Sequence, residues 1–247
     1  MALFSRSVLM GRGKIKILLV FWFLVSVIMA TVFAVSQEKE KREMEEKNIK
    51  LPQYKTTGKI SVEETLKKRR SVRKFTDASI SIEEISQLLW AAYGFTASDG
   101  RKTTPSAGAT YPLEIYIAVR KADKLKPGLY RYLPESHSLK FIKEGDILSQ
   151  VSETTYQPEM CKSAPVHIII TAVIERTTSV YGQRGIRYIH MEAGHSAQNI
   201  SLQGVALNIG SVLVGAFEDE KLSRVLEAGK DEIPLYIIPV GKTEKYK

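Results

Sequence analysis

From residue 60 onward, the pattern of apolar and polar residues first predicts helices. Ser61 and Ser81 are each followed three residues later by a glutamate, which is the signature of a capping box at a helix N-terminus. After Ser81, apolar residues recur at helical spacing as far as Gly94, where we expect the helix to end. Two more helices are predicted over 186–209, where small residues allow close packing, and over 218–227.

Strand patterns lie between these helices. Residues 114–120 alternate as a strand does, and residues 166–174 form a continuous β-branched run, typical of a strand covered on both faces. The other predicted strands are a hairpin over 128–132 and 138–141, and the segments 212–217 and 233–240. Helices that cover a central sheet make an α+β sandwich the predicted fold class.

The N-terminus carries a different pattern. Ile17–Val35 is a charge-free apolar run of 19 residues, interrupted only by Ser26 and Thr31. As a helix it would be about 28 Å long, close to the thickness of the hydrocarbon core of a bilayer. We expect residues 1–35 to be a signal anchor with one transmembrane helix, and a cleaved signal peptide is the alternative.

The remaining boundaries follow from composition. Residues 36–59 are charged and then rich in Pro, Thr and Gly, so we expect a linker with little to bury. The folded domain is predicted over 60–243. We expect a single-pass membrane protein, or an exported one if the signal is cleaved, with the domain on the extracytoplasmic side favoured.

The net charge of +9, taken alone, suggests a nucleic-acid or membrane-surface binder. The distribution of this charge along the chain changes that interpretation. Residues 1–35 contain four basic and no acidic residues, and residues 67–74 contain six basic and no acidic residues. The rest of 60–247 has 19 basic and 22 acidic residues. A nucleic-acid surface would need a wider basic footprint, so we expect no nucleic-acid partner.

The sequence lacks the patterns typical of several common kinds of site. A single cysteine, Cys161, excludes an intramolecular disulfide, a cysteine zinc site and an iron–sulfur cluster, and we expect it to be an inert, partly buried thiol. His190 and His195 are five residues apart, whereas two metal ligands on one helical face need four, so we expect structural roles and no metal. The Rossmann and P-loop glycine patterns and G-x-S-x-G are absent from the sequence.

Three segments carry candidate chemistry. The basic run around Arg69–Arg73 is either a solvated face or, being compact, a cradle for one phosphate monoester. The segment 104–114 (TPSAGATYPLE) is either a turn before a strand or a loop whose small residues let a flat ligand approach the backbone. The segment 210–217 (GSVLVGAF) is either a strand end or a source of backbone N–H groups for a ring.

Together these segments resemble the FMN-dependent nitroreductase family, particularly its SagB-type (azoline-dehydrogenase-like) branch. The resemblance covers about residues 60–243 and rests on RRSVRKF, PSAGATYPLE, RYIHMEAGHSAQNISLQGVALNIG, the GAF turn and the closing IIPVG, in that order. It implies a nitroreductase-like α/β/α sandwich with a mainly antiparallel central sheet. It also implies FMN as cofactor and a homodimer with the flavin at the interface.

The resemblance assigns roles to individual residues. The phosphate, ribityl chain and pyrimidine edge of FMN would be bound by Arg69, Arg70, Ser71 and Arg73. The partner subunit would contribute Pro105, Ser106, Ala107 and Gly108. Gly215 and Ala216 would present backbone N–H groups near flavin N5, and Lys242 would return a basic group to the phosphate. No catalytic residue is assigned.

The implied function is two-electron, ping-pong transfer between a reduced donor and a small organic or peptide-derived acceptor. The donor would be NAD(P)H or, for an extracytoplasmic domain, a quinol or a protein. One alternative is azoline dehydrogenation in a modified peptide, for which family members use a Lys-Tyr pair whose nearest counterpart is Arg187-Tyr188. The other is a non-enzymatic, membrane-tethered module that binds anions.

Overall fold

The computed structural model describes Trp22, Met29, Phe33 and residues 48–246. The chain divides into two compact units, residues 1–47 and residues 48–247, and the second is the folded domain. Apart from Trp22, Met29 and Phe33, which are helical and exposed, the predicted membrane segment lies outside the described residues. Within the part of the chain that is described, no helix is both long and apolar enough to cross a bilayer.

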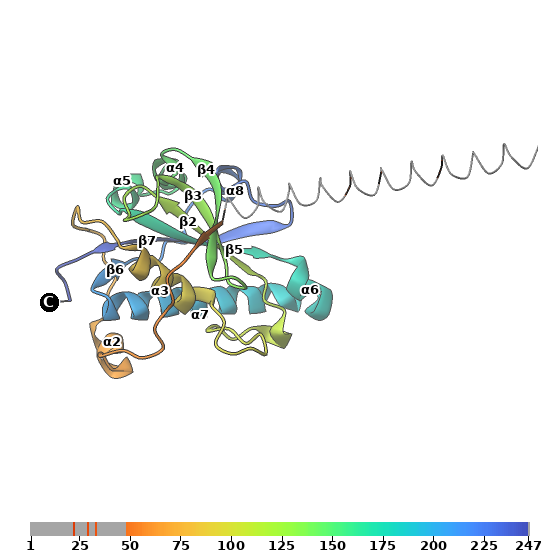
Figure 1. Ribbon diagram of the computed structural model, residues 1–247, viewed down its shortest axis with the longest axis horizontal. Helices are drawn as coiled ribbons and strands as arrows, with labels where there is room; N and C mark the ends of the chain where they lie inside the picture. The colour runs from red at the N-terminus through yellow and green to blue at the C-terminus, as the bar shows by residue number, and fades with distance from the viewer. Residues whose placement is uncertain (1–21, 23–28, 30–32, 34–47, 247) are drawn as a thin grey trace, which may run out of the picture. The chain divides into compact units, whose positions relative to one another are not determined.

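The domain is built around one antiparallel sheet (Figure 1). Over residues 48–246 the sheet has seven strands in the order β1-β4-β3-β2-β5-β7-β6. The strands are β1 (Asn48–Lys50), β2 (Leu113–Val119), β3 (Gly128–Leu133), β4 (Ser138–Glu144), β5 (Val166–Val173), β6 (Ile209–Ser211) and β7 (Glu232–Lys242). The helices are α2 (Val62–Lys68), α3 (Ile82–Tyr93), α4 (Ile147–Ser152), α5 (Pro158–Lys162), α6 (Glu175–Tyr181), α7 (Arg184–Ala206) and α8 (Asp219–Leu226), with a 3-10 turn at Ala107–Ala109.

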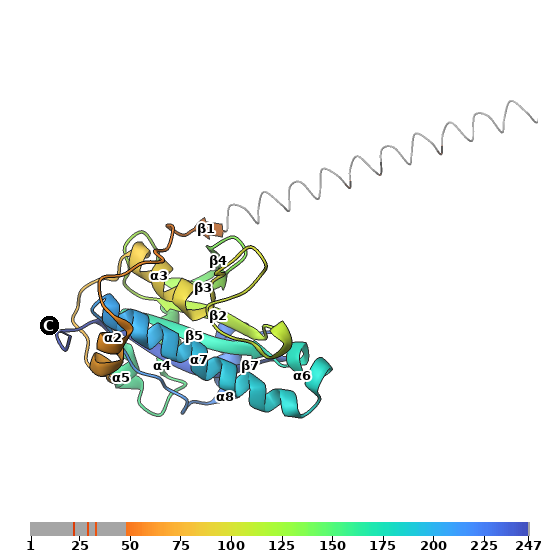
Figure 2. The same ribbon diagram turned by 90° about the horizontal axis from the view of Figure 1, so that it is seen from below.

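Helices cover both faces of this sheet. On one face α3 and α7 lie side by side (Figure 2), and their buried residues pack on Ile115, Ile168 and Ile238. On the other face α4 and α8 pack against Tyr116 and Ile169 of the same central strands. Because β2 and β5 are covered on both faces, almost every side chain in them is buried. The three layers confirm the predicted α+β sandwich with an antiparallel sheet.

The local signals in the sequence set most helix ends. At Ser81 the capping box is complete, since Ser81 and Glu84 each accept from the other's backbone N–H. At Ser61 the hydroxyl accepts from the Glu64 N–H, while the Glu64 carboxylate forms an ion pair with Lys68 at 2.7 Å. Gly94 ends α3 as predicted.

One strand prediction is wrong. Residues 212–217 were expected to form a strand, but the strand is β6, which pairs residue by residue with the end of β7. Residues 212–217 follow it as extended chain that touches the sheet through the isolated bridge between Val214 and Ile237. The apolar residues of this segment therefore pack without continuing a strand ladder.

The predicted linker over 36–59 also needs correction. Asn48–Lys50 pairs with β4, and Leu51 is 4% exposed within the main core. Tyr54 stacks on Trp90 with ring centroids 4.7 Å apart, and the Lys55 N–H donates to Gln87. The folded domain thus begins at Asn48, because the side chains of Ile49, Leu51 and Tyr54 pack on it despite the polar composition around them.

The segment after α2 lies so close to the sheet that two glycines are required. A Cβ on Gly210 would lie 2.6 Å from Val72 Cγ1, and one on Gly241 would lie 2.8 Å from both Phe75 Cδ1 and Pro165 Cδ. Val72 is fully buried, and its N–H donates to the Ser211 carbonyl at 2.8 Å. The missing side chains therefore let residues 71–76 lie flat on β6 and β7.

We expect Gly210→Ala to lower the free energy of unfolding by about 1–3 kcal/mol, because the new methyl group overpacks Val72. Equilibrium urea unfolding measures this effect. Gly58→Ala is the matched control, since a Cβ there meets nothing within 4 Å. Equal denaturation midpoints for the two variants would contradict this account of the close approach.

A buried histidine makes the stability of the domain depend on pH. His167 on β5 is fully buried, its Nε2 donates to the Cys161 carbonyl at 3.0 Å, and its Nδ1 has no partner among the described residues. Burial lowers the pKa of His167 from 6.5 to about 4. Protonation therefore favours the unfolded chain, whose imidazole takes up the proton at higher pH.

Stability should fall as the pH drops from about 6.5 to about 4, by an amount on the order of 3 kcal/mol from this residue alone. His167→Gln should flatten this part of the profile of unfolding free energy against pH. His190→Gln, at an exposed position, controls for the loss of a histidine. A wild-type slope in the His167→Gln variant would show that another group is responsible.

Candidate functional site

The basic segment is fixed on the sheet by its own backbone. Ser71 forms a parallel bridge with Ser211, and the Thr76 N–H donates to the Lys242 carbonyl at 2.9 Å. Because side chains alternate along an extended segment, Val72 points into the core while Ser71 and Arg73 are exposed. The fold thus presents one edge of RRSVR to solvent beside the paired ends of β6 and β7.

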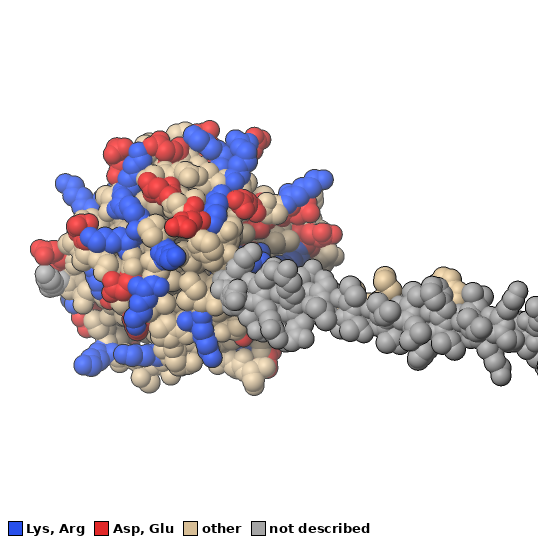
Figure 3. Space-filling view, turned by 45° about the horizontal axis from the view of Figure 1, so that its top comes forward, with Lys and Arg blue, Asp and Glu red and all other residues tan. Residues whose placement is uncertain are grey.

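Few basic residues of this segment have an acidic partner among the described residues. Of the six basic residues in 67–74, the structure pairs one, Lys68, with an acidic partner among the described residues. The Arg70 guanidinium turns back to the carbonyls of Lys67 and Arg69 at 2.8 and 2.7 Å. Elsewhere on the face shown in Figure 3, basic and acidic side chains are interspersed. The segment is therefore a local surplus of positive charge, suited to a small anion.

Lys242 lies near the segment, but its amine is engaged. Its Nζ pairs with the Glu84 carboxylate, which also caps α3. The Thr76 contact places the Lys242 backbone beside the chain that follows the basic segment, while the side chain is held by Glu84 of α3. Binding of an anion by this amine would first require release of Glu84.

The turn at Gly215 and Ala216 leaves backbone donors open. Among the backbone hydrogen bonds recorded for the described residues, neither of the two N–H groups donates. A Cβ on Gly215 would meet no atom nearer than Tyr236 at 3.9 Å, so packing within the chain does not require glycine there. Gly215 lines a hollow of about 440 Å³ together with Tyr236 and with His190 and Ala193 of α7. The turn can therefore accept a flat ligand from outside.

Both groups lie along the same edge of the domain. Ser71 is beside Ser211, which pairs with Val240, and Val214 is beside Ile237. Along β7, the step from Val240 to Ile237 spans about 10 Å, a distance that a ribityl chain can bridge. The structure therefore places the basic segment and the Gly215 turn along the same stretch of β7.

The loop that contains Pro105–Gly108 is strained and firmly held. Three of its residues adopt left-handed backbone conformations, with φ of 59° at Gly108, 52° at Ala109 and 45° at Tyr111. The Ser106 hydroxyl accepts from the Tyr111 N–H at 2.9 Å, and Arg176 donates to the Tyr111 carbonyl at 3.2 Å. Such strain is typical of loops whose shape serves a ligand.

A buried carboxyl that sequence reasoning missed supports this loop. Glu192 of α7 is 3% exposed and accepts from the Tyr93 hydroxyl at 2.6 Å, and that hydroxyl accepts from the Leu113 N–H at the end of the loop at 3.3 Å. Burial raises the pKa of Glu192, and burial followed by the nearby Glu192 raises the pKa of Tyr93. A charged residue inside the helical pattern of 186–209 was the available signal, since helix faces that pack on a sheet rarely carry acids.

Within one chain, α7 contacts both the start of this loop and the strand that holds the basic segment. Asn199 Nδ2 donates to the Thr103 carbonyl at 3.2 Å and to Thr104 Oγ1 at 3.3 Å, directly before Pro105. Two residues farther along α7, Ser201 accepts from Ser211, which bridges Ser71. No hydrogen bond among the described residues joins Pro105–Gly108 directly to Arg69–Arg73.

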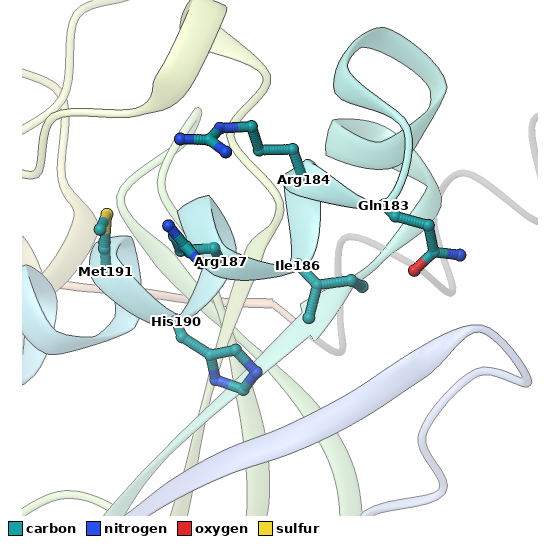
Figure 4. A pocket seen from close by; sticks show the side chains of 6 residues that line it. All are labelled: Gln183, Arg184, Ile186, Arg187, His190 and Met191. Atoms are coloured by element: carbon teal, nitrogen blue, oxygen red, sulfur yellow. The ribbon is translucent and has the colours of Figure 1, made fainter.

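The first turns of α7 line an open hollow of about 870 Å³ (Figure 4). Arg187, His190 and Met191 project from successive turns of the helix around it. Tyr188 does not line it, because its hydroxyl accepts from Arg184 Nε at 3.1 Å and its ring packs edge-on against Tyr181. Arg187 and Tyr188 therefore face different surroundings.

The structure also shows the surroundings of Cys161, His190 and His195, for which the sequence predicts no ligand role. Cys161 is fully buried, beyond the partial burial expected, and burial raises the pKa of its thiol. His190 and His195 are exposed on α7. No group of three or more His, Cys, Asp or Glu among the described residues has the arrangement of a metal site.

Known proteins resemble this chain in both sequence and fold. A proposed nitroreductase of Methanocaldococcus jannaschii is 45% identical over 183 residues, covering 74% of this chain and 91% of that protein. A crystal structure of a proposed nitroreductase from Ralstonia eutropha superposes with a TM-score of 0.72 at 27% identity, covering 80% and 90% of the two chains. A proposed nitroreductase from Desulfovibrio desulfuricans, solved in complex with FMN, has the same fold with a TM-score of 0.56 at 18% identity, covering 75% and 88%.

The match with the family is continuous. The nitroreductase family matches residues 66–242, from the end of α2 to the last residue of β7. This range contains the basic segment, the strained loop and the Gly215 turn. With that continuous match and the relatives above, the chain belongs to the nitroreductase family.

Proposed function

We propose that this oxidoreductase of the nitroreductase family uses FMN, held between the basic segment and the Gly215 turn. The observation that carries the proposal is that the basic segment and the Gly215 turn lie along the same edge of the domain. Arg69, Ser71 and Arg73 offer cations and a hydroxyl at one end, and the free N–H groups of Gly215 and Ala216 lie about 10 Å along β7. The spacing and the donor types fit a phosphate at one end and a polar ring edge at the other.

FMN bound there would supply the two-electron redox chemistry, and the residues of the chain would bind and orient it. Arg73 and Arg69 would hold the phosphate, with Ser71 donating to its oxygens or to the ribityl chain. The N–H groups at Gly215 and Ala216 would fix the ring edge and set its hydrogen bonding. Arg70 and Lys242 would join after leaving their present partners.

The proposed active unit is a homodimer. No hydrogen bond among the described residues joins the strained loop directly to the basic segment of its own chain, and the loop would complete the site of a second copy. The exposed face of α7 suits such a contact, since Met191 is 53% exposed and a Cβ on Gly194 would meet nothing within 4 Å. Pro105, Ser106, Ala107 and Gly108 would then lie against the partner's flavin.

The finer assignment rests on sequence motifs. We place the chain in the SagB-type branch because two features follow the basic segment in order. These are PSAGATYPLE and the long helix that contains Gly194-His195 and Gln198-Asn199. The reaction would be ping-pong transfer from NAD(P)H, a quinol or a protein donor to a small organic or peptide-derived acceptor. The segment Ile17–Val35 would anchor the protein in a membrane, with the domain on the extracytoplasmic side favoured.

One observation bears on azoline dehydrogenation as the alternative reaction. Arg187 lines an open hollow at the start of α7, large enough for a peptide segment, but Tyr188 is turned away toward Arg184 and Tyr181. The pair would therefore act together on a substrate after Tyr188 rotates. General flavin-dependent reduction needs no such movement, so we favour it.

Glu192 would act as a positioning residue for the loop. Glu192→Ala should lower the free energy of unfolding by about 2–4 kcal/mol, because the Tyr93 hydroxyl, which holds Leu113 at the end of the loop, loses its buried acceptor. It should also expose Arg101 and Lys102, on the approach to the loop, to faster tryptic cleavage. Glu192→Gln retains an acceptor oxygen and should lose less than half as much. Equal effects of Ala and Gln on cleavage rate would show that Glu192 does not hold the loop through its hydrogen bond with Tyr93.

The flavin proposal is tested on the full-length chain purified in mild detergent. The protein should be yellow and release about one FMN per chain on denaturation. Arg69→Ala combined with Arg73→Ala should weaken FMN binding by at least about a hundredfold, since two charge-assisted phosphate contacts are lost. Circular dichroism checks that the fold is retained.

Arg224→Ala combined with Lys230→Ala removes two exposed cations elsewhere and serves as the matched control. This variant should bind FMN like the wild type. Absence of flavin from the wild-type protein after reconstitution would favour the non-enzymatic, anion-binding alternative. Wild-type affinity in the Arg69 and Arg73 double variant would overturn the phosphate assignment.

A further inference from the structure

A further cavity is lined in part by Ala109, Thr110 and Tyr111 of the strained loop. It has a volume of about 610 Å³ and lies where β2 begins and β3 ends. Its size is within the range of small-molecule sites. The apolar part of the lining includes Leu113, Ile115, Tyr132, Leu133 and Pro134.

One lysine in this cavity has no charged partner. Lys102 Nζ lies 4.0 Å from the ring centre of Tyr93 and 5.0 Å from that of Tyr111, and it forms no hydrogen bond or ion pair with the described residues. Aromatic faces hold an ammonium in place but supply only part of the stabilisation lost with water. Burial accordingly lowers the pKa of Lys102, while Glu135 and Glu114 oppose this at longer range.

The other charges that line the cavity are largely satisfied. The Glu114 carboxylate is 11% exposed and forms ion pairs with Arg131 and Arg176, each at 2.6 Å. Arg101 pairs with Asp99 at the same distance. Glu135 is exposed at the rim. The uncompensated group inside the cavity is therefore the single ammonium of Lys102.

This charge balance selects a ligand class. One free ammonium matches one negative charge, and the exposed Glu135 carboxylate disfavours a phosphate, which carries about −1.5 to −2. Arg131 and Arg176 are both engaged by Glu114, so the Lys102 ammonium is the donor left for a ligand carboxylate. The apolar strand residues leave room for a hydrophobic body beside the charge.

We propose that this cavity binds a small organic carboxylate with an aromatic or apolar body, its carboxylate on Lys102 and its body against Tyr132 and Leu133. The site shares the strained loop with the proposed flavin site, because Ala109 and Tyr111 line the cavity and Pro105–Gly108 precede them. Occupancy of the cavity would therefore add contacts to a loop that the flavin of a partner would also touch.

The test uses the full-length protein with 3-phenylpropanoate as probe and its neutral amide, 3-phenylpropanamide, as the matched ligand. Isothermal titration calorimetry should detect the carboxylate and show the amide to be weaker by at least about tenfold. Lys102→Met keeps the aliphatic stem on the aromatic rings and should weaken the carboxylate by about tenfold, while Lys102→Arg should keep most of the affinity. Lys140→Met, at an exposed position on β4, is the control and should bind like the wild type.

A second measurement needs no variant. The probe should protect Lys102 of the wild-type chain from reductive methylation, with the modified residues located by mass spectrometry. Equal affinity for carboxylate and amide, unchanged affinity in Lys102→Met, or no binding at about 10 mM probe would each overturn the proposal. FMN content, measured on the same samples, separates failure of this site from failure of the flavin site.

Discussion

The close packing of α7 against the sheet is the interaction on which both parts of the candidate site depend. Ala193 and Ala197 are buried on the face of α7 that meets the sheet, and a Cβ on Gly204 would lie 2.7 Å from the Ile209 carbonyl oxygen. The helix can therefore run directly into β6, which in turn holds Ser71 through its bridge to Ser211. Farther back on the same helix, Glu192 accepts from the Tyr93 hydroxyl, which in turn accepts from the Leu113 N–H at the end of the strained loop. One rigid element thus fixes the separation between the two groups.

The distribution of compensated and uncompensated charge marks where ligands are expected. Buried carboxyls of this domain are well supplied with partners: Glu114 has two arginines, and Glu232 accepts from Tyr116 and Thr171. In contrast, Arg69, Arg73 and Lys102 have no acidic partner among the described residues. A charge that folding leaves without a partner is costly if it is partly buried, and an anionic ligand removes that cost. This reasoning applies to Lys102 and to the half-buried Arg69, whereas the exposed Arg73 attracts an anion without such a burial cost.

Much of the fold could be predicted because its signals are local. The capping residues Ser61 and Ser81, the stop at Gly94 and the β-branched run of β5 each act within a few residues of where they occur. The segment 212–217 was misassigned because its apolar residues satisfy packing without a partner strand, which periodicity alone does not reveal. Residues 48–55 were missed for a related reason. Their few apolar side chains gain their importance from Trp90 and Gln87 on α3, far along the chain.

The sequence by itself determined the family, the elements and the residue types of the basic segment, the loop and the turn, because motifs and short-range periodicity are written along the chain. The tertiary structure decided which of these meet. It placed Ser71 and Gly215 on one edge and joined Lys242 to Glu84 across 158 positions. It also brought Tyr93 to Glu192 and left Lys102 among aromatic rings. Such contacts depend on burial and on pairs distant in sequence, so they exist only once the sheet and α7 have packed together.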